Sequence, residues 1–293
     1  MATLTGNPTT ARQPAAWRKN LTVGKALGWA TENFLAIMIL VVSLFPIFWL
    51  GLTSFKNLAD VYTTKVFVPL TLQNYKDIFG EPNFFQYAAL NSLIVTTVAC
   101  AISIPLGLAA AYAFARYRFR GSQALLIGVL VTQFIPPLVT VLPFWTLFRS
   151  LGISTSHIAL IVVYLSIVMP YSIWMLVGFI EALPVEVEEA ASVDGCTELQ
   201  TLRHITLPLV MPGVITTLIF SFIMCWNEFT FALILTDNHT RTLQVALYST
   251  NGYRGVLWEQ MAAAGMIIMV PVFILSFLIR RYFVEGITMG AVK

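Results

Sequence analysis

Residues 183–212 read LPVEVEEAASVDGCTELQTLRHITLPLVMP and form the most charge-dense stretch in the interior of an otherwise apolar chain. The pattern predicts two short helices separated by one tight turn. Pro184 suits the first position of the first helix, and the acidic residues that follow favour the positive end of a helix dipole. That helix should end at Gly195, because glycine adopts the left-handed C-terminal conformation without steric cost.

The second short helix is predicted by Thr197 and Gln200, which have the spacing of a capping box. We expect it to run to about His204 and to end before Leu207-Pro208, because proline removes a backbone donor. From charge and capping alone, the segment has two interpretations. It is a solvated polar linker between apolar segments, or it is a docking element for an electropositive partner.

Six apolar stretches surround this segment, and each is close to the 20 or so residues that a membrane-spanning helix needs. They are residues 33–53, 88–115, 124–147, 158–180, 213–235 and 261–283. The chain is 58% hydrophobic and 11% charged, with a mean hydropathy of +0.79, which excludes a soluble globular protein. The predicted fold class is an all-α polytopic membrane protein with six transmembrane helices.

The basic residues predict the orientation of these spans. Eleven of the 17 would lie on the side of the termini, namely Arg12, Arg18, Lys19, Lys25, Arg116, Arg118, Arg120, Arg203, Arg280, Arg281 and Lys293. The other six are Lys56, Lys65, Lys76, Arg149, Arg241 and Arg254. By the positive-inside rule, both termini and the polar segment between spans four and five are cytoplasmic. Residues 1–28 are then a cytoplasmic N-terminal tail.

Small residues and prolines predict how the spans pack. The second span contains Gly107, Ala109, Ala110, Ala111, Ala113 and Ala115, which would let another helix approach closely. Prolines at 105, 136, 137, 143, 170 and 271 favour kinks, because each removes a backbone hydrogen bond.

No enzyme motif is present in the sequence. There is no HExxH, CxxC or GxSxG pattern, and the one Gly-Lys step, Gly24-Lys25, lacks the remaining residues of a phosphate-binding loop. The three cysteines are widely separated, and the predicted topology places the three histidines on different sides, so we expect neither a disulfide framework nor a metal site. Dispersed basic residues predict no nucleic-acid partner. If the chain belongs to a pump, another subunit must hydrolyse the nucleotide.

The polar segment also contains a spaced motif. It reads Glu189-Ala190-Ala191, three residues, Gly195, nine residues, and Ile205-x-Leu207-Pro208. In this order and without a gap it resembles the signature loop of inner-membrane permease subunits of ABC importers. Other stretches resemble the carbohydrate branch, in particular the second permease subunit of maltose-type transporters. They are TSFK (53–56), NSL (91–93), AAYAFAR (110–116), DG (194–195), WNEF (226–229) and the ending 286–293.

The resemblance implies an architecture, a location and partners. Residues 29–293 would form the importer's transmembrane domain in the bacterial inner membrane, with a cytoplasmic coupling loop at 183–208. The partners would be a second homologous permease, a dimer of ATPase subunits and an extracytoplasmic sugar-binding protein. The chain itself would hold no cofactor, since ATP and magnesium would be used by the ATPase. The cargo would be an oligosaccharide, a disaccharide or a polyol.

The resemblance also implies residue roles in coupling. Glu189 would pair with a basic group of the ATPase, Ala190 and Ala191 would make close apolar contact with it, and Gly195 would supply the turn. The other residues of the expected coupling site are Asp194, Ile205, Leu207 and Pro208.

A substrate path is expected in the fifth span. Met224, Asn227, Glu228 and Phe231 follow i, i+3, i+4, i+7 spacing, so one helix face would offer an amide, a carboxylate and a ring to a sugar. The alternative is that Glu228 pairs with a partner-subunit residue and Asn227 bonds a neighbouring helix.

The competing function is an ion-gradient-driven secondary transporter. Such proteins tend to have internal repeats and several ionisable groups within the membrane. This sequence has no convincing repeat, and Glu228 is the only acid deep within a predicted span. Both observations favour the passive half of an ATP-driven importer.

Overall fold

The structure is a computed structural model that describes residues 23–80, 85–117, 119–252 and 255–290. Most of the predicted N-terminal tail lies outside the described residues. The same holds for six of the basic residues used to predict orientation, which are Arg12, Arg18, Lys19, Arg118, Arg254 and Lys293.

The described chain is helical apart from one short antiparallel hairpin. Its elements in order are α1 (Val23–Ser54), α2 (Leu58–Val61), α3 (Gln73–Phe79), α4 (Phe85–Arg116), α5 (Ser122–Val131), the 3-10 turn η1 (Thr132–Phe134), α6 (Pro137–Ser150), α7 (His157–Glu181), α8 (Val185–Val193), α9 (Glu198–Thr201), the π-helix η2 (Leu202–Thr206), α10 (Leu207–Trp226), α11 (Thr230–Leu235), α12 (Leu243–Ser249), β1 (Asn251–Gly252), β2 (Gly255–Val256) and α13 (Trp258–Gly290). The predicted all-α class is confirmed.

Among the described residues, five helices are long and apolar enough to cross a membrane, and a bent pair makes a sixth candidate. The bent pair is Ser122–Phe134 with Pro137–Ser150, whose axes differ by 95°. The bend falls at Pro136, which has an extended backbone and precedes a second proline at the first position of α6. The kink predicted there is confirmed, although so large an angle was not expected.

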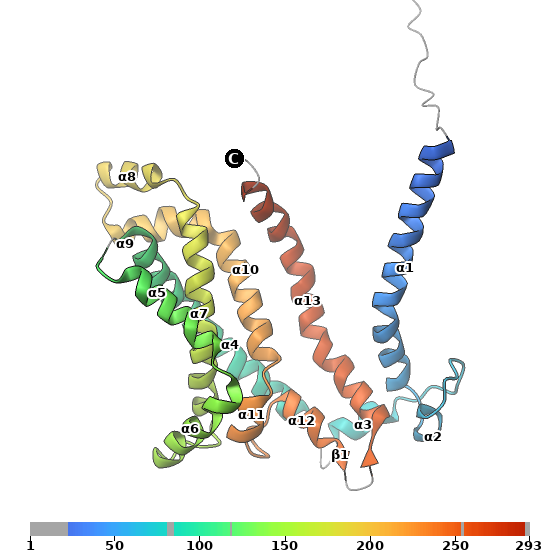
Figure 1. Cartoon of the computed structure of the whole chain (residues 1–293). Helices are drawn as coiled ribbons and strands as arrows, with labels where there is room; N and C mark the ends of the chain where they lie inside the picture. The colour runs from blue at the N-terminus through green and yellow to red at the C-terminus, as the bar shows by residue number, and fades with distance from the viewer. Residues whose placement is uncertain (1–22, 81–84, 118, 253–254, 291–293) are drawn as a thin grey trace, which may run out of the picture. The chain divides into compact units, whose positions relative to one another are not determined.

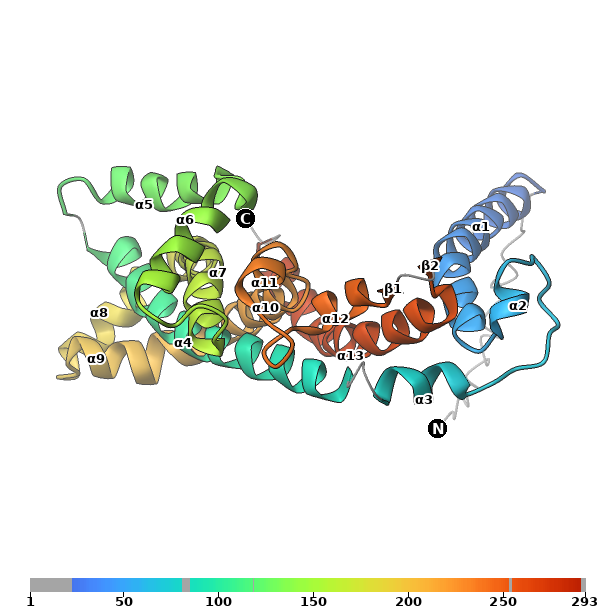
Figure 2. The ribbon, with the colours of Figure 1, turned by 90° about the horizontal axis from the view of Figure 1, so that it is seen from below.

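The chain divides into two compact units, residues 1–49 and 50–293. The described part of the first unit is the greater part of α1, an apolar helix with Pro46 in its interior. In the second unit, α4, α7 and α10 pack against one another, and α10 also packs against α13. Figure 2 shows α10 between α7 and α13.

The close approach of α4 and α7 explains the small residues of the second span. A Cβ atom added to Gly107 would lie 3.0 Å from the Cβ of Ser172 on α7, and Ala111 is fully buried. Larger side chains at these positions would force the two helices apart. The predicted packing seam is therefore confirmed at Gly107 and Ala111, whereas Ala109 on the same helix is exposed.

The polar connections of the second unit gather at two opposite ends. Figure 1 shows α8 and α9 at one end of the bundle and α6, α11 and α12 at the other. The 183–206 segment therefore lies at the same end of the bundle as the inner ends of α4, α7 and α10. Here "inner" denotes the end of the bundle that carries α8, and "outer" denotes the opposite end.

Two predictions about helix ends are wrong. Leu207-Pro208 does not end the second loop helix, because α9, η2 and α10 continue as one helix, Glu198–Trp226. The wider π turn just before Pro208 lets the chain continue past the missing backbone donor. The fifth span also does not reach residue 235, because α10 ends at Trp226 and a separate helix, α11, begins at Thr230.

Candidate functional site

The first helix of the polar segment, α8, ends in a tight left-handed turn. Gly195 has a φ of +87°, a conformation that side chains with a Cβ resist. The amide of Gly195 donates to the carbonyl of Ser192 at 3.1 Å, and that of Cys196 donates to the carbonyl of Ala191 at 3.0 Å. These two bonds make a Schellman motif, so the predicted turn at Gly195 is confirmed.

Pro184 lies one position earlier than predicted. It precedes α8 with an extended ψ of 131°, and the helix begins at Val185. The acidic residues Glu186 and Glu188 still occupy the first turn, where they favour the helix dipole.

The second helix, α9, begins with the predicted capping box. The amide of Gln200 donates to the Thr197 hydroxyl at 3.4 Å, and the amide of Thr197 donates to the Gln200 side-chain oxygen at 2.8 Å. The capping box prediction is therefore confirmed. Together with the Schellman turn, it fixes the angle between α8 and α9 through local hydrogen bonds.

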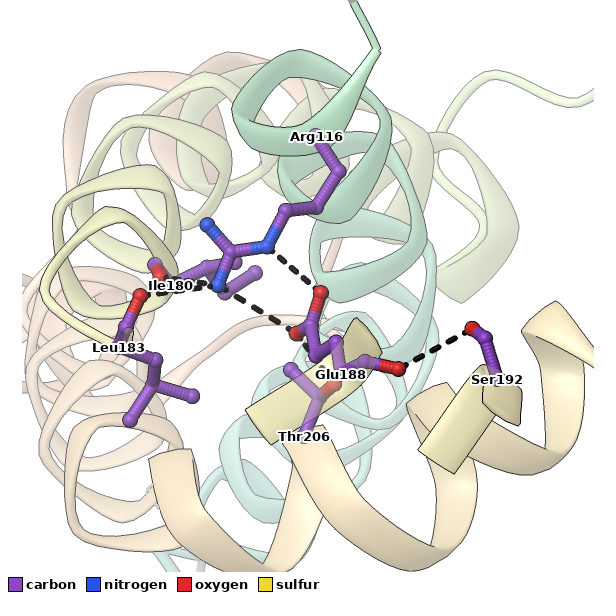
Figure 3. A network of polar contacts seen from close by, with 6 residues as sticks. All are labelled: Arg116, Ile180, Leu183, Glu188, Ser192 and Thr206. Atoms are coloured by element: carbon purple, nitrogen blue, oxygen red, sulfur yellow. Dashed lines mark hydrogen bonds and ion pairs between the residues drawn. The ribbon is translucent and has the colours of Figure 1, made fainter. Parts of the chain in front are cut away.

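A buried ion pair fastens α8 to the bundle. Arg116, the last residue of α4, donates from Nε to Oε2 of Glu188 at 2.7 Å, and the two side chains are only 11% and 10% exposed. The Thr206 hydroxyl donates to Oε1 of the same glutamate at 2.7 Å. Figure 3 shows Arg116 and Thr206 approaching Glu188 from different helices.

The guanidinium also binds the end of α7. Its Nη2 donates to the carbonyl of Ile180 at 3.0 Å and to that of Leu183 at 3.2 Å (Figure 3). These carbonyls lie at a helix C-terminus, which lacks intrahelical donors and favours a cation. Arg116, Glu188 and Thr206, which we call the inner hub, therefore join α4, the end of α7, α8 and the start of α10.

Sequence reasoning missed the inner hub. Arg116 was used to predict orientation and as part of the AAYAFAR stretch, and Glu188 only as one of several loop acids. The available signal was the first of three closely spaced arginines, at the end of a long apolar helix, together with an acidic loop on the same predicted side of the membrane. That pattern indicates a pair without saying which of the acids is the partner.

A second contact joins the α4–α5 connection to α9. The Tyr117 hydroxyl donates to Oε2 of Glu198 at 2.5 Å. This hydrogen bond to the carboxylate raises the pKa of Tyr117 to about 12, because loss of the phenol proton would place two negative charges side by side. Consecutive residues of the α4 terminus therefore contact both α8 and α9.

The rest of the polar segment presents both acidic and apolar side chains to solvent. Glu189, Ala190 and Asp194 are exposed, whereas Ala191 faces inward at 7% exposure. Val193 is 88% exposed and Leu199 is 72% exposed. Of the other expected coupling residues, Pro208 is exposed and Ile205 and Leu207 are half-buried. The expected contact pair of Ala190 and Ala191 is thus divided between the surface and the interior.

The four residues of the expected substrate path do not share a helix face. Asn227 ends α10 with an exposed side chain that donates to the Ile223 carbonyl at 2.9 Å. Glu228 lies just before α11, and its carboxylate accepts from the amides of Phe231 at 2.9 Å and Ala232 at 3.1 Å in that helix. The prediction of one helix face is wrong because these bonds start a new helix inside the predicted fifth span.

The two apolar members of that set belong to the core. Phe231 is 3% exposed and meets the Phe144 ring edge to face, with centroids 6.0 Å apart. Met224 packs against the same buried cluster of α4, α6, α7 and α11. Asn227 is the one member of the four that the structure leaves exposed.

Among the described residues, no group of three or more His, Cys, Asp or Glu side chains is placed to hold a metal ion. The thiols of Cys100 and Cys225 are buried and free, and Cys196 is half-buried and free.

Comparison with known proteins gives consistent matches. Residues 103–289 match the family described as "Binding-protein-dependent transport system inner membrane component". The chain is 34% identical to the diacetylchitobiose uptake system permease protein DasC of Streptomyces coelicolor, over 91% of this chain and 98% of that protein. It is 32% identical to the trehalose/maltose transport system permease protein MalG of Thermococcus litoralis, over 88% of this chain and 94% of that protein.

A solved structure has the same fold. It is a chain of a bacterial ABC transporter involved in the import of the acidic polysaccharide alginate, with a TM-score of 0.74 over 89% of this chain and 98% of that one. Sequence identity to that chain is 21%, so the likeness concerns the fold.

Proposed function

The chain belongs to the family of binding-protein-dependent transport system inner membrane components, and from that premise we propose that it is one of two permease subunits enclosing the path of a sugar. The family membership makes it a membrane permease subunit of an ABC importer. An oligosaccharide, disaccharide or polyol is the proposed cargo, which the names of DasC and MalG support. A binding protein would deliver this cargo from outside.

The observation that carries the proposal is the rigid structure of the 183–206 segment. Its two short helices are held at a set angle by a Schellman turn and a capping box, and a buried ion pair fastens them to the bundle. A lever needs this rigidity, since a flexible loop would absorb the displacement it should pass on. A secondary transporter has no evident need for such a segment.

The proposed partner of this segment is an ATPase subunit. The exposed surface of α8 and α9 offers Glu189, Val193 and Leu199 to solvent. Apolar side chains among carboxylates suit a cleft with an apolar floor and a basic rim. We therefore assign Glu189 to an ion pair with a basic ATPase residue and Ala190 to the close contact, and ATP and magnesium are used by that subunit.

Gly195→Val tests the lever role. Valine at a φ of +87° strains the backbone, so the angle between α8 and α9 should change. With the cognate ATPase, second permease and binding protein in proteoliposomes, sugar uptake and the stimulation of ATP hydrolysis by loaded binding protein should both be lost. The matched control is Gly152→Val, which imposes similar strain at a φ of +70° in the outer α6–α7 connection. Normal stimulation in the Gly195 variant would rule out the lever.

Cytoplasmic termini and a cytoplasmic coupling loop complete the proposal. They are supported by the distribution of basic residues. In a background without the native cysteines, a cysteine at exposed Ser192 should resist an impermeant thiol reagent in intact cells, whereas one at exposed Asn238 should react. The reverse labelling pattern would contradict the orientation and the ATPase docking together.

A further inference from the structure

The outer end of α4 carries a second polar junction, which no step of the proposed function uses. The Asn91 amide nitrogen donates to the carbonyl of His239 at 2.7 Å and to that of Arg241 at 3.1 Å. The Asn91 oxygen lies 2.9 Å from Nε2 of His157, the first residue of α7. Asn91 is 7% exposed, so these contacts are sheltered from water.

The chemistry of these contacts sets the orientation of the amide. Both carbonyls require a donor, so the nitrogen of Asn91 faces them and its oxygen must accept from the imidazole N–H. The neighbouring Ser92 hydroxyl accepts from the amide of Leu243 at 2.8 Å. Residues 236–242 form the α11–α12 connection, which we call the outer loop. Asn91 and Ser92 therefore hold its second half and the first residue of α12.

The two junctions lie at opposite ends of one helix. Asn91 and Arg116 are 25 residues apart on α4, which corresponds to about 38 Å at 1.5 Å per residue. Both junctions also include α7, through His157 outside and the carbonyls of Ile180 and Leu183 inside. The close seam at Gly107 and Ser172 joins the two helices between these points.

We propose that the α4–α7 pair is a rigid strut that carries displacement between the coupling loop and the outer loop, with Arg116 and Asn91 as its two positioning residues. Arg116 attaches α8 at the inner end, and Asn91 attaches the outer loop at the other. This inference rests on the proposed function, since it presumes that an ATPase moves α8. It adds the route by which that movement reaches the outer face.

A strut of this kind needs firm joints and a stiff body. The inner joint is a planar guanidinium that bonds a carboxylate and two carbonyls at once, a geometry that a lysine cannot reproduce. The outer joint uses both the donors and the acceptor of one amide. The body is a pair of tightly packed helices, each of which runs as one continuous helix through its internal proline, Pro105 in α4 and Pro170 in α7. Packed helices shift as units rather than bend smoothly.

The test compares variants that cut each joint while limiting damage to the fold. At the inner joint, Arg116→Met combined with Glu188→Gln removes both charges together, so no buried charge is left unpaired. At the outer joint, Asn91→Ala removes the side-chain amide that bonds His239, Arg241 and His157. The controls are Arg120→Met and Asn238→Ala. They change exposed residues in the α4–α5 connection, near the inner joint, and in the outer loop.

The readout is the stimulation of ATP hydrolysis by sugar-loaded binding protein, divided by the basal rate, in the reconstituted complex. Each joint variant should assemble, keep its basal rate and lose about tenfold in this ratio, within the range usual for coupling between two sites. Cutting both joints should cost no more than the larger single loss, because both lie on one route. Both controls should retain wild-type stimulation.

Other outcomes separate the two proposals. Wild-type stimulation in either joint variant overturns the strut, as do losses that multiply in the combined variant. A loss of assembly with an unchanged ratio in the residual complex assigns the joints to stability alone and also overturns it. If the wild-type complex shows no ATP-driven uptake with its cognate partners, the proposed function itself fails.

Discussion

Two glutamates of this chain are withdrawn from solvent by opposite means. Glu188 is paired with Arg116, which lies 72 residues away, and also binds Thr206 of the π-helix. Glu228 binds backbone amides three and four residues ahead, and it also contacts the Tyr164 hydroxyl of α7. The first glutamate joins several helices through an ion pair, whereas the second mainly caps the helix that follows it.

The difference shows which parts of the molecule can move together. A carboxylate that bridges distant helices makes them one body, so the inner hub ties α8 to α4, α7 and α10. A carboxylate whose main bonds cap the following helix fixes a local break in the chain. Glu228 thereby fixes the break between the end of α10 and the start of α11.

The largest effect should come from removing the bridging carboxylate. Glu188→Ala leaves the Arg116 charge buried without its partner, which should lower the free energy of unfolding by about 3–5 kcal/mol. The neighbouring exposed Glu189→Ala should change it by no more than about 0.5 kcal/mol while impairing stimulation of the ATPase. Thermal unfolding of the purified complex and its ATPase activity measure both quantities.

This pair of adjacent variants is a sharp control on the assignment of roles. If Glu189→Ala destabilised the fold and Glu188→Ala did not, Glu189 would have the structural role that we assign to Glu188. If both left stimulation intact, docking through this face of α8 would be contradicted.

A smaller effect is expected at the local cap. Glu228→Ala frees two amides at the start of α11, which should cost about 1–2 kcal/mol, typical of a lost helix cap. Glu228→Gln should cost less, because its amide oxygen still accepts one of the two bonds. Comparing the unfolding midpoints of these variants with that of Glu188→Ala tests the ranking. A cost at Glu228 equal to that at Glu188 would show that its contact with Tyr164 on α7 stabilises the fold as strongly as the Arg116–Glu188 ion pair does.

The same contrast explains what the sequence could predict. The Gly195 turn and the Thr197–Gln200 capping box were predicted because every residue they need lies within a few positions. The hub was missed because Arg116 and Glu188 meet only after α4 and α8 have packed. The break after Trp226 was missed for another reason. Residues 213–235 are mostly apolar on both sides of Asn227 and Glu228, and helical spacing does not show where one helix stops and another starts.

The smallest effect on stability, and the most informative one for transport, is expected at Asn227. Its exposed side chain bonds only the Ile223 carbonyl within its own helix among the contacts described, so Asn227→Ala should change the free energy of unfolding by less than about 1 kcal/mol. If its amide lines the sugar path, uptake should nevertheless fall several-fold, because a hydrogen bond to a hydroxyl contributes about 1 kcal/mol. Sugar uptake, complex yield and basal ATPase activity should be measured together. Uptake at the wild-type rate would remove Asn227 from the path, whereas reduced complex yield would assign it to contact with a neighbouring subunit.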